Sequence, residues 1–193
     1  MTRSVFLVLT YTANGSTSKA LSFSGSSATL SPVAPGTTYV FTLSQGEDSS
    51  VLGGELTYAV PAAATFSNYG VSPETLEFMM CRRPSWSGWD RWDISSSDYR
   101  TQYSAGENTA LVIKRNVEYV HTEDMVGVLF VIRDSAGAVV DTSTIAPDYW
   151  FDMWNKGYCY LDIPSIPGTA GDYTIELYFN NQLATTIQFK VTE

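Results

Sequence analysis

The sequence predicts an all-β protein made of two tandem β-sandwich domains. Charged residues make up only 16% of the chain, which suits strands with Ser- and Thr-rich outer faces better than amphipathic helices. The 12 Tyr, 9 Phe and 5 Trp residues also favour strands, because aromatic side chains pack well on a pleated surface. The 193 residues would fill either one large all-β domain or two of about 100 residues, and the turn pattern favours two.

Residues 1–61 form the first predicted domain, a series of short strands separated by turns. The Asn14-Gly15 dipeptide between apolar runs indicates a hairpin. Gly53-Gly54 precedes the last strand, and Pro61 closes it. Strands are expected at residues 4–11, 20–23, 28–30, 38–43 and 55–60.

The segment 27–43 predicts a corner between two strands. Its two arms alternate apolar and polar residues, and Pro32, Pro35 and Gly36 force a turn between them. Tyr39 opens the second arm, where a tyrosine hydroxyl can bond back to the backbone a few residues upstream. We therefore expect Tyr39 to be a structural corner residue.

The same residues resemble the E–F corner of fibronectin type III modules, with Leu30 and Pro35-Gly36-Thr37-Thr38-Tyr39 as the matching signature. The resemblance covers residues 5–60 and implies strands C, C′, E, F and G, without strands A and B. A sandwich lacking two strands exposes its core and an open edge. Either the sequence begins inside a module, or the second domain or a neighbouring chain covers the core, so a strand-sharing oligomer is one expectation.

Residues 62–70 are expected to be a linker and residues 71–193 a second sandwich. Ala62-Ala63-Ala64 and the polar Ser67-Asn68 indicate the linker, and Asn180-Asn181 indicates a hairpin near the end of the chain. Strands are expected at residues 75–80, 110–120, 125–133, 138–143, 149–163 (with a break near 155–157), 171–179 and 183–191.

The end of the chain resembles the last strands of bacterial surface immunoglobulin-like modules. The matching residues are Gly171 and Tyr173, followed by Phe189 and Val191. The resemblance implies an immunoglobulin-like β-sandwich, with Tyr173 as a second corner tyrosine. Two such modules in tandem imply a secreted or wall-attached bacterial protein.

The insertion 82–106 in the second domain contains the candidate ligand-binding residues. They are aromatic or charged: Trp86, Trp89, Trp92, Asp90, Arg91 and Tyr99. Exposed tryptophans three residues apart could stack on sugars or dock on an apolar partner surface. Alternatively they form a small core, and we prefer this interpretation because a long loop must bury something to stay ordered.

Nothing in the sequence indicates an enzyme. The only histidine, His121, lies in a predicted solvated turn, and no Gly-x-Ser-x-Gly motif occurs. Close acidic pairs such as Asp90 with Asp93 are more typical of a solvated loop than of a glycosidase site. Asp90, Asp93 and Asp98 could ligate calcium, but they follow no defined loop pattern. We expect no catalytic residue, no metal and no cofactor.

Charge and hydropathy narrow the range of partners. The net charge of −9 and only 11 Lys and Arg residues argue against a nucleic-acid partner. No apolar run approaches the roughly 20 residues of a membrane span, so membrane insertion is not expected. Cys81 and Cys159 are expected to be two thiols in preference to a disulfide, because their strand phases differ.

We therefore expect a non-catalytic, extracellular or cell-surface module pair. It would act as a spacer or protein-interaction region of a larger bacterial surface or secreted protein. One alternative is a carbohydrate-binding module that uses an exposed tryptophan platform. A second alternative is a pair of accessory domains of a secreted glycoside hydrolase.

Overall fold

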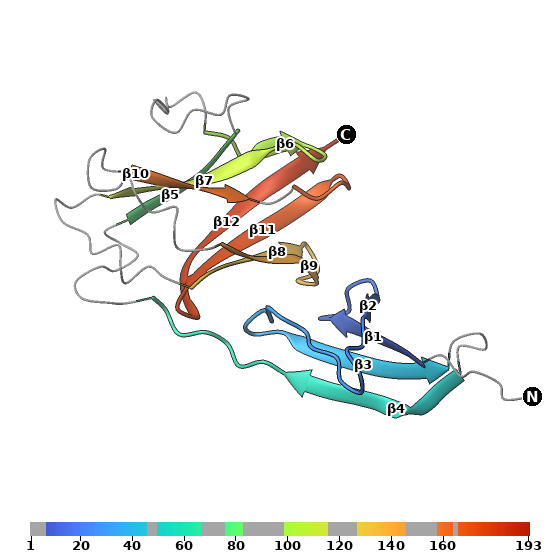
Figure 1. Ribbon diagram of the computed structural model, residues 1–193. Helices are drawn as coiled ribbons and strands as arrows, with labels where there is room; N and C mark the ends of the chain where they lie inside the picture. The colour runs from blue at the N-terminus through green and yellow to red at the C-terminus, as the bar shows by residue number, and fades with distance from the viewer. Residues whose placement is uncertain are drawn as a thin grey trace, which may run out of the picture. The chain divides into compact units, whose positions relative to one another are not determined.

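The computed structural model describes residues 7–45, 50–66, 76–82, 99–115, 127–145, 158–163 and 166–193. These residues contain strands and turns and no helix, so the predicted all-β class is confirmed (Figure 1). The chain divides into two compact units. Unit 1 comprises residues 1–62 and 137–139, and unit 2 comprises residues 63–136 and 140–193.

Unit 1 contains a four-stranded antiparallel sheet with the order β2-β1-β3-β4 (Figure 1). Its strands are β1 (Leu7–Ala13), β2 (Lys19–Leu21), β3 (Thr38–Gln45) and β4 (Ser50–Ala59). The predicted hairpin at Asn14-Gly15 is confirmed: both residues have positive φ, at 51° and 76°, as a primed turn requires. The Ser16 amide closes this turn on the Ala13 carbonyl at 3.1 Å.

The predicted strand at residues 28–30 is wrong. These residues belong to no strand, and a single bridge between Ser24 and Ser27 precedes them. Three residues of apolar alternation make few ladder bonds, and the described residues provide no neighbouring strand to pair with them.

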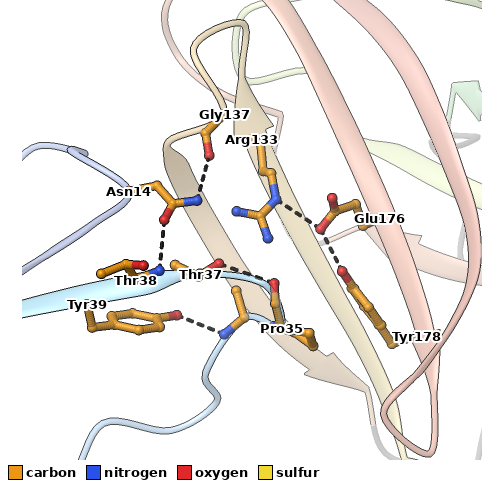
Figure 2. Close-up of polar contacts among 10 residues, drawn as sticks. Asn14, Pro35, Thr37, Thr38, Tyr39, Arg133, Gly137, Glu176 and Tyr178 are labelled. Carbon is orange, nitrogen blue, oxygen red and sulfur yellow. Dashed lines mark hydrogen bonds and ion pairs between the residues drawn. The ribbon is translucent and has the colours of Figure 1, made fainter. Parts of the chain in front are cut away.

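A tyrosine-centred corner links this irregular segment to β3. The buried Tyr39 hydroxyl accepts a hydrogen bond from the Ala34 amide at 2.8 Å, five residues upstream (Figure 2). The Gly36 amide donates to the Pro61 carbonyl at 3.0 Å, and the Val60 amide donates to the Thr37 carbonyl at 2.9 Å. The corner is therefore tied both to itself and to the end of β4.

Unit 2 contains two sheets (Figure 1). The three-stranded sheet has the order β10-β7-β5, with β5 (Leu76–Arg82), β7 (Thr109–Arg115) and β10 (Tyr158–Ile163). The five-stranded sheet has the order β6-β12-β11-β8-β9. Its strands are β6 (Gln102–Ser104), β8 (Val128–Asp134), β9 (Val139–Ile145), β11 (Gly171–Phe179) and β12 (Gln182–Thr192).

Alternate residues of the two sheets form one hydrophobic core in unit 2. The core includes Leu111 and Ile113 of β7, Phe130 of β8, and Ile175 and Leu177 of β11. Because residues two apart in a strand point to the same face, the two sheets contribute one face each. Unit 2 is thus a β-sandwich.

Residues 63–66 of the segment expected as a linker belong to unit 2. Phe66 is buried and packs edge-on against Phe179, with ring centroids 5.1 Å apart. Its amide donates to the Leu183 carbonyl at 2.8 Å, and the Leu183 amide donates to the Ala64 carbonyl at 2.8 Å. Burial of an aromatic ring outweighs the loop-like composition here, while residues 67–70 lie outside the described residues.

The hairpin predicted at Asn180-Asn181 is confirmed, since both residues have positive φ (47° and 61°) between β11 and β12. Upstream, the Tyr173 hydroxyl donates to the Thr169 carbonyl at 2.9 Å. The Tyr173 ring stacks on Phe189 with centroids 5.7 Å apart. Unit 2 therefore also has a tyrosine whose hydroxyl reaches back to the backbone upstream.

The sheet register separates the two cysteines. Cys81 of β5 pairs with Ala110 of β7, and Cys159 of β10 pairs with Ile113 of β7. Since β7 lies between them, two strand spacings of about 4.8 Å separate their backbones. This exceeds the roughly 7 Å limit on the Cα separation of a disulfide, so the register does not allow the two cysteines to be bridged.

Candidate binding surfaces

Most of the candidate binding residues lie outside the described part of the chain. These are Trp86, Trp89, Trp92, Asp90 and Arg91. The same holds for His121, Asp93 and Asp98. Tyr99 is described: it is half-buried, forms a bridge with Cys81 and packs against the cluster of Cys81, Ala110 and Val112.

One face of the unit 1 sheet is apolar. Register and alternation place on it Leu7, Leu9, Tyr11, Tyr39, Phe41, Leu43, Leu56 and Tyr58. The opposite face is rich in threonine, with Thr10 of β1, Thr42 of β3 and Thr57 of β4 as examples. We call the first surface the apolar face of unit 1.

This apolar face is covered near the corner and open along β4, where Tyr58 is the cross-strand neighbour of Tyr39, and at the start of β1. Tyr39, beside the corner, is only 2% exposed, whereas Leu56 is 68% exposed and Tyr58 57% exposed. Leu7 at the start of β1 is also 48% exposed. Monomeric proteins rarely leave contiguous apolar patches in water, so this surface is a candidate contact site.

Strand β4 adds an open edge to the same surface. It is ten residues long and, among the described strands, pairs only with β3. It contains one charged residue, Glu55, and bends near Gly54, whose φ is +86°. An edge strand of this length with exposed apolar side chains is a template for pairing with another chain.

Unit 2 has a pocket of about 510 Å³ at one side of its sandwich. It is lined by Phe78, Met79, Met80, Tyr99, Arg100, Thr101, Gln102 and Ile187. The strands β5 and β12 supply its apolar residues, and the segment 99–102 supplies its polar ones. The pocket therefore combines apolar walls with a polar rim.

The pocket exists because residues 99–104 cross from one sheet to the other. The Arg100 amide donates to the Met80 carbonyl of β5 at 3.1 Å. One residue later, the Thr101 carbonyl accepts from the Lys190 amide of β12 at 2.8 Å. The crossing is held by the buried Tyr103, whose hydroxyl donates to the Arg100 carbonyl at 2.7 Å. Beyond Arg100 the segment no longer runs along β5, and the pocket lies in the space beside that strand.

Two arginines near the pocket share one carboxylate. Oε1 of Glu107 lies 3.4 Å from Nε of Arg82 and 3.8 Å from Nη1 of Arg100. Oε2 of Glu107 accepts the Ser104 amide at 2.9 Å. Burial raises the pKa of Tyr103, and Cys81 and Glu107 raise it further. Among the described residues, the two cations at this rim are therefore paired with a single carboxylate.

A second polar network joins β8 and β11. Nε of Arg133 donates to Oε2 of Glu176 at 3.0 Å, and the Tyr178 hydroxyl donates to the same oxygen at 2.8 Å (Figure 2). Burial raises the pKa of Tyr178, and its hydrogen bond to Glu176 raises it further. These contacts link β8 to β11 and stabilise the sheet.

The described residues contain neither a metal-binding cluster nor a membrane-spanning helix. In ranges 7–45, 50–66, 76–82, 99–115, 127–145, 158–163 and 166–193, no group of three or more His, Cys, Asp or Glu side chains could hold a metal ion. The same residues include no helix with the length and hydropathy of a membrane crossing.

Comparison with known proteins adds no family to this picture. No protein-family model matches the chain, and a search of curated proteins found no match.

Proposed function

We propose that this chain is a non-catalytic module pair of a larger bacterial surface or secreted protein, acting as a spacer or protein-interaction region. The observation that carries the proposal is the open apolar face of unit 1, with Leu56 and Tyr58 more than half exposed. A surface of this kind is stabilised when further polypeptide covers it.

The sheet order supports this proposal. The order β2-β1-β3-β4 matches C′-C-F-G, which is one sheet of the module that the Leu30 to Tyr39 motif resembles. In a complete sandwich a second sheet packs on the inner face of this one. The apolar face of unit 1 is therefore the face that added strands would cover, and a second copy of the chain is one source of such strands.

Strand β4 has the features that pairing with a second copy requires. In an antiparallel pair of β4 strands centred on Leu56, Glu55 of one copy would lie opposite Thr57 of the other. The only charge of the strand then meets a neutral residue, and the apolar faces of the two sheets become continuous.

Light scattering of the whole chain over a range of concentrations tests the proposal. We expect dimers or larger assemblies, and we expect Leu56→Lys to shift the chain to the monomer. Thr57→Lys is the matched control, because it adds the same charge at an exposed site on the opposite face, where it would lie opposite Glu55 of the other copy, and it should leave the assemblies intact. A monomer at every concentration, with unit 1 well ordered, would contradict this form of the proposal.

Carbohydrate binding through Trp86, Trp89 and Trp92 stays an alternative prediction, as does an accessory role beside a glycoside hydrolase. Tyr99 favours the first of these modestly, because its half-buried ring lines the unit 2 pocket. A glycan array probed with the wild-type chain and with Trp89→Ala distinguishes it from the leading proposal. Binding lost in the variant supports sugar recognition, and no binding to any glycan excludes it.

A further inference from the structure

We propose that the pocket of unit 2 binds an extended, acidic peptide segment of a partner protein as an added strand beside β5. The site lies wholly in unit 2 and does not depend on the apolar face of unit 1. It would give the module pair a second, chemically distinct contact surface.

The backbone of β5 provides the first argument. The Met80 carbonyl points away from β7, because it accepts the Arg100 amide on the outer side of the strand. Residues two apart in an antiparallel strand direct their N–H and C=O groups to the same side. The N–H and C=O of Phe78 therefore point to this outer edge, where no described residue bonds them. A peptide strand can continue the ladder there.

The shape of the pocket provides the second argument. It opens beside Phe78 and Met79, where the crossing segment turns from β5 towards β12. Phe78 and Ile187 are partly buried and pack against the core, so they form a fixed apolar wall. Strand addition combines main-chain bonds with pockets for alternate side chains, and this pocket can take one apolar side chain of the peptide.

The local charge gives the peptide its acidic character. Arg82 and Arg100 are exposed and, in the described residues, pair only with Glu107. Among the described residues the site has a surplus positive charge, since Arg100 is the one charged residue in the pocket lining, on a chain whose net charge is −9. Arg100 lines the pocket itself, so a carboxylate two residues from the inserted apolar side chain, on the same face of the added strand, would meet its guanidinium. The open ladder positions favour a peptide over a sugar, because a sugar has no backbone amide and carbonyl groups to continue the ladder.

The test is an NMR titration of the isotope-labelled whole chain with three defined probes. The first is a capped hexapeptide with the order Ser-Ile-Ser-Asp-Ser-Ile, which places isoleucine and aspartate on one face of a strand, and the second has lysine in place of aspartate. The third is a trimer of galacturonate, an anionic sugar. We expect the acidic peptide to produce saturable shifts at the amides of Phe78, Met79, Thr101 and Gln102, and the lysine peptide to produce none.

Variants separate the proposed contact from non-specific attraction. Arg100→Gln should raise the Kd of the acidic peptide about tenfold, as expected for loss of a charge-assisted hydrogen bond. Arg82→Gln should raise it by less, because it removes the surplus charge and leaves the contacting group. Lys19→Gln, which neutralises an exposed cation of unit 1, should leave the Kd unchanged.

Three results would overturn the proposal. The first is that millimolar acidic peptide produces no saturable shift of these amides. The second is that the lysine peptide shifts them as much as the acidic peptide does. The third is that galacturonate shifts them saturably and the acidic peptide does not. The last result would identify an anionic-sugar site. Self-association through unit 1 is measured with Leu56→Lys, so either proposal can fail while the other stands.

Discussion

The unit 1 sheet and the five-stranded sheet of unit 2 both have apolar side chains at alternate strand positions, but they bury them differently. In β11, Tyr173, Ile175 and Leu177 are all buried against the opposing three-stranded sheet. In β4, Leu56 and Tyr58 follow the same alternation and are mostly exposed. Alternation therefore marks which face is apolar, whereas burial requires a second layer to cover it.

The largest expected effect comes from truncating equivalent apolar residues in the two units. Phe130→Ala should lower the free energy of unfolding of unit 2 by about 3–5 kcal/mol, because it leaves a cavity in a closed core. In the monomer, at concentrations below those at which light scattering detects association, Leu56→Ala should change the stability of unit 1 by less than about 0.5 kcal/mol, because its side chain is in water. Urea unfolding followed by residue-resolved NMR measures each unit separately. Equal losses would show that the apolar face of unit 1 is covered in solution.

The two corner tyrosines come next. Tyr39→Phe should destabilise unit 1 by about 1–3 kcal/mol, because it leaves the buried amide of Ala34 without an acceptor. Tyr173→Phe should cost unit 2 only about 1 kcal/mol, because its hydroxyl donates to a carbonyl that can find another donor. The measurement is the shift of the urea midpoint at constant slope. A larger loss of stability for Tyr173→Phe than for Tyr39→Phe would contradict this reasoning. It would mean that a carbonyl without its tyrosine donor costs more than a buried amide without its tyrosine acceptor.

Unit 2 should lose stability at alkaline pH through Tyr178 and Tyr103. Folding raises the pKa of both above the ordinary 10.0, so the unfolded chain releases these protons first. Their full contribution is present below pH 10 and declines as the pH rises above it. Thermal unfolding between pH 8 and pH 11 measures this, and Tyr178→Phe should flatten part of the decline. An unchanged slope in that variant would show that Tyr178 titrates normally.

The smallest expected effect concerns the cysteines. Because β7 lies between Cys81 and Cys159, the unfolding temperature should be the same with and without a reducing agent. A thiol assay in denaturant, without reductant, should find both thiols. A single intramolecular disulfide would contradict the register of the three-stranded sheet.

The sequence predicted the structure correctly where one or two residues determine the backbone conformation. The turns at Asn14-Gly15 and Asn180-Asn181 follow from the ability of Asn and Gly to adopt positive φ. The strand expected at residues 28–30 did not form, because strands depend on a neighbour that alternation cannot reveal. The pocket beside β5 could not be predicted either, since no motif in residues 99–104 signals a crossing between sheets.

The sequence by itself determined the all-β class, the primed turns and the apolar alternation of the strands, because each depends on the conformational preferences of neighbouring residues. Only the tertiary structure decided that Phe66 belongs to the core of unit 2 and that the apolar face of unit 1 is open. It also decided that two arginines share Glu107 at the rim of a pocket. These features depend on contacts between residues far apart in the chain, and local preferences do not encode which distant partner a side chain meets.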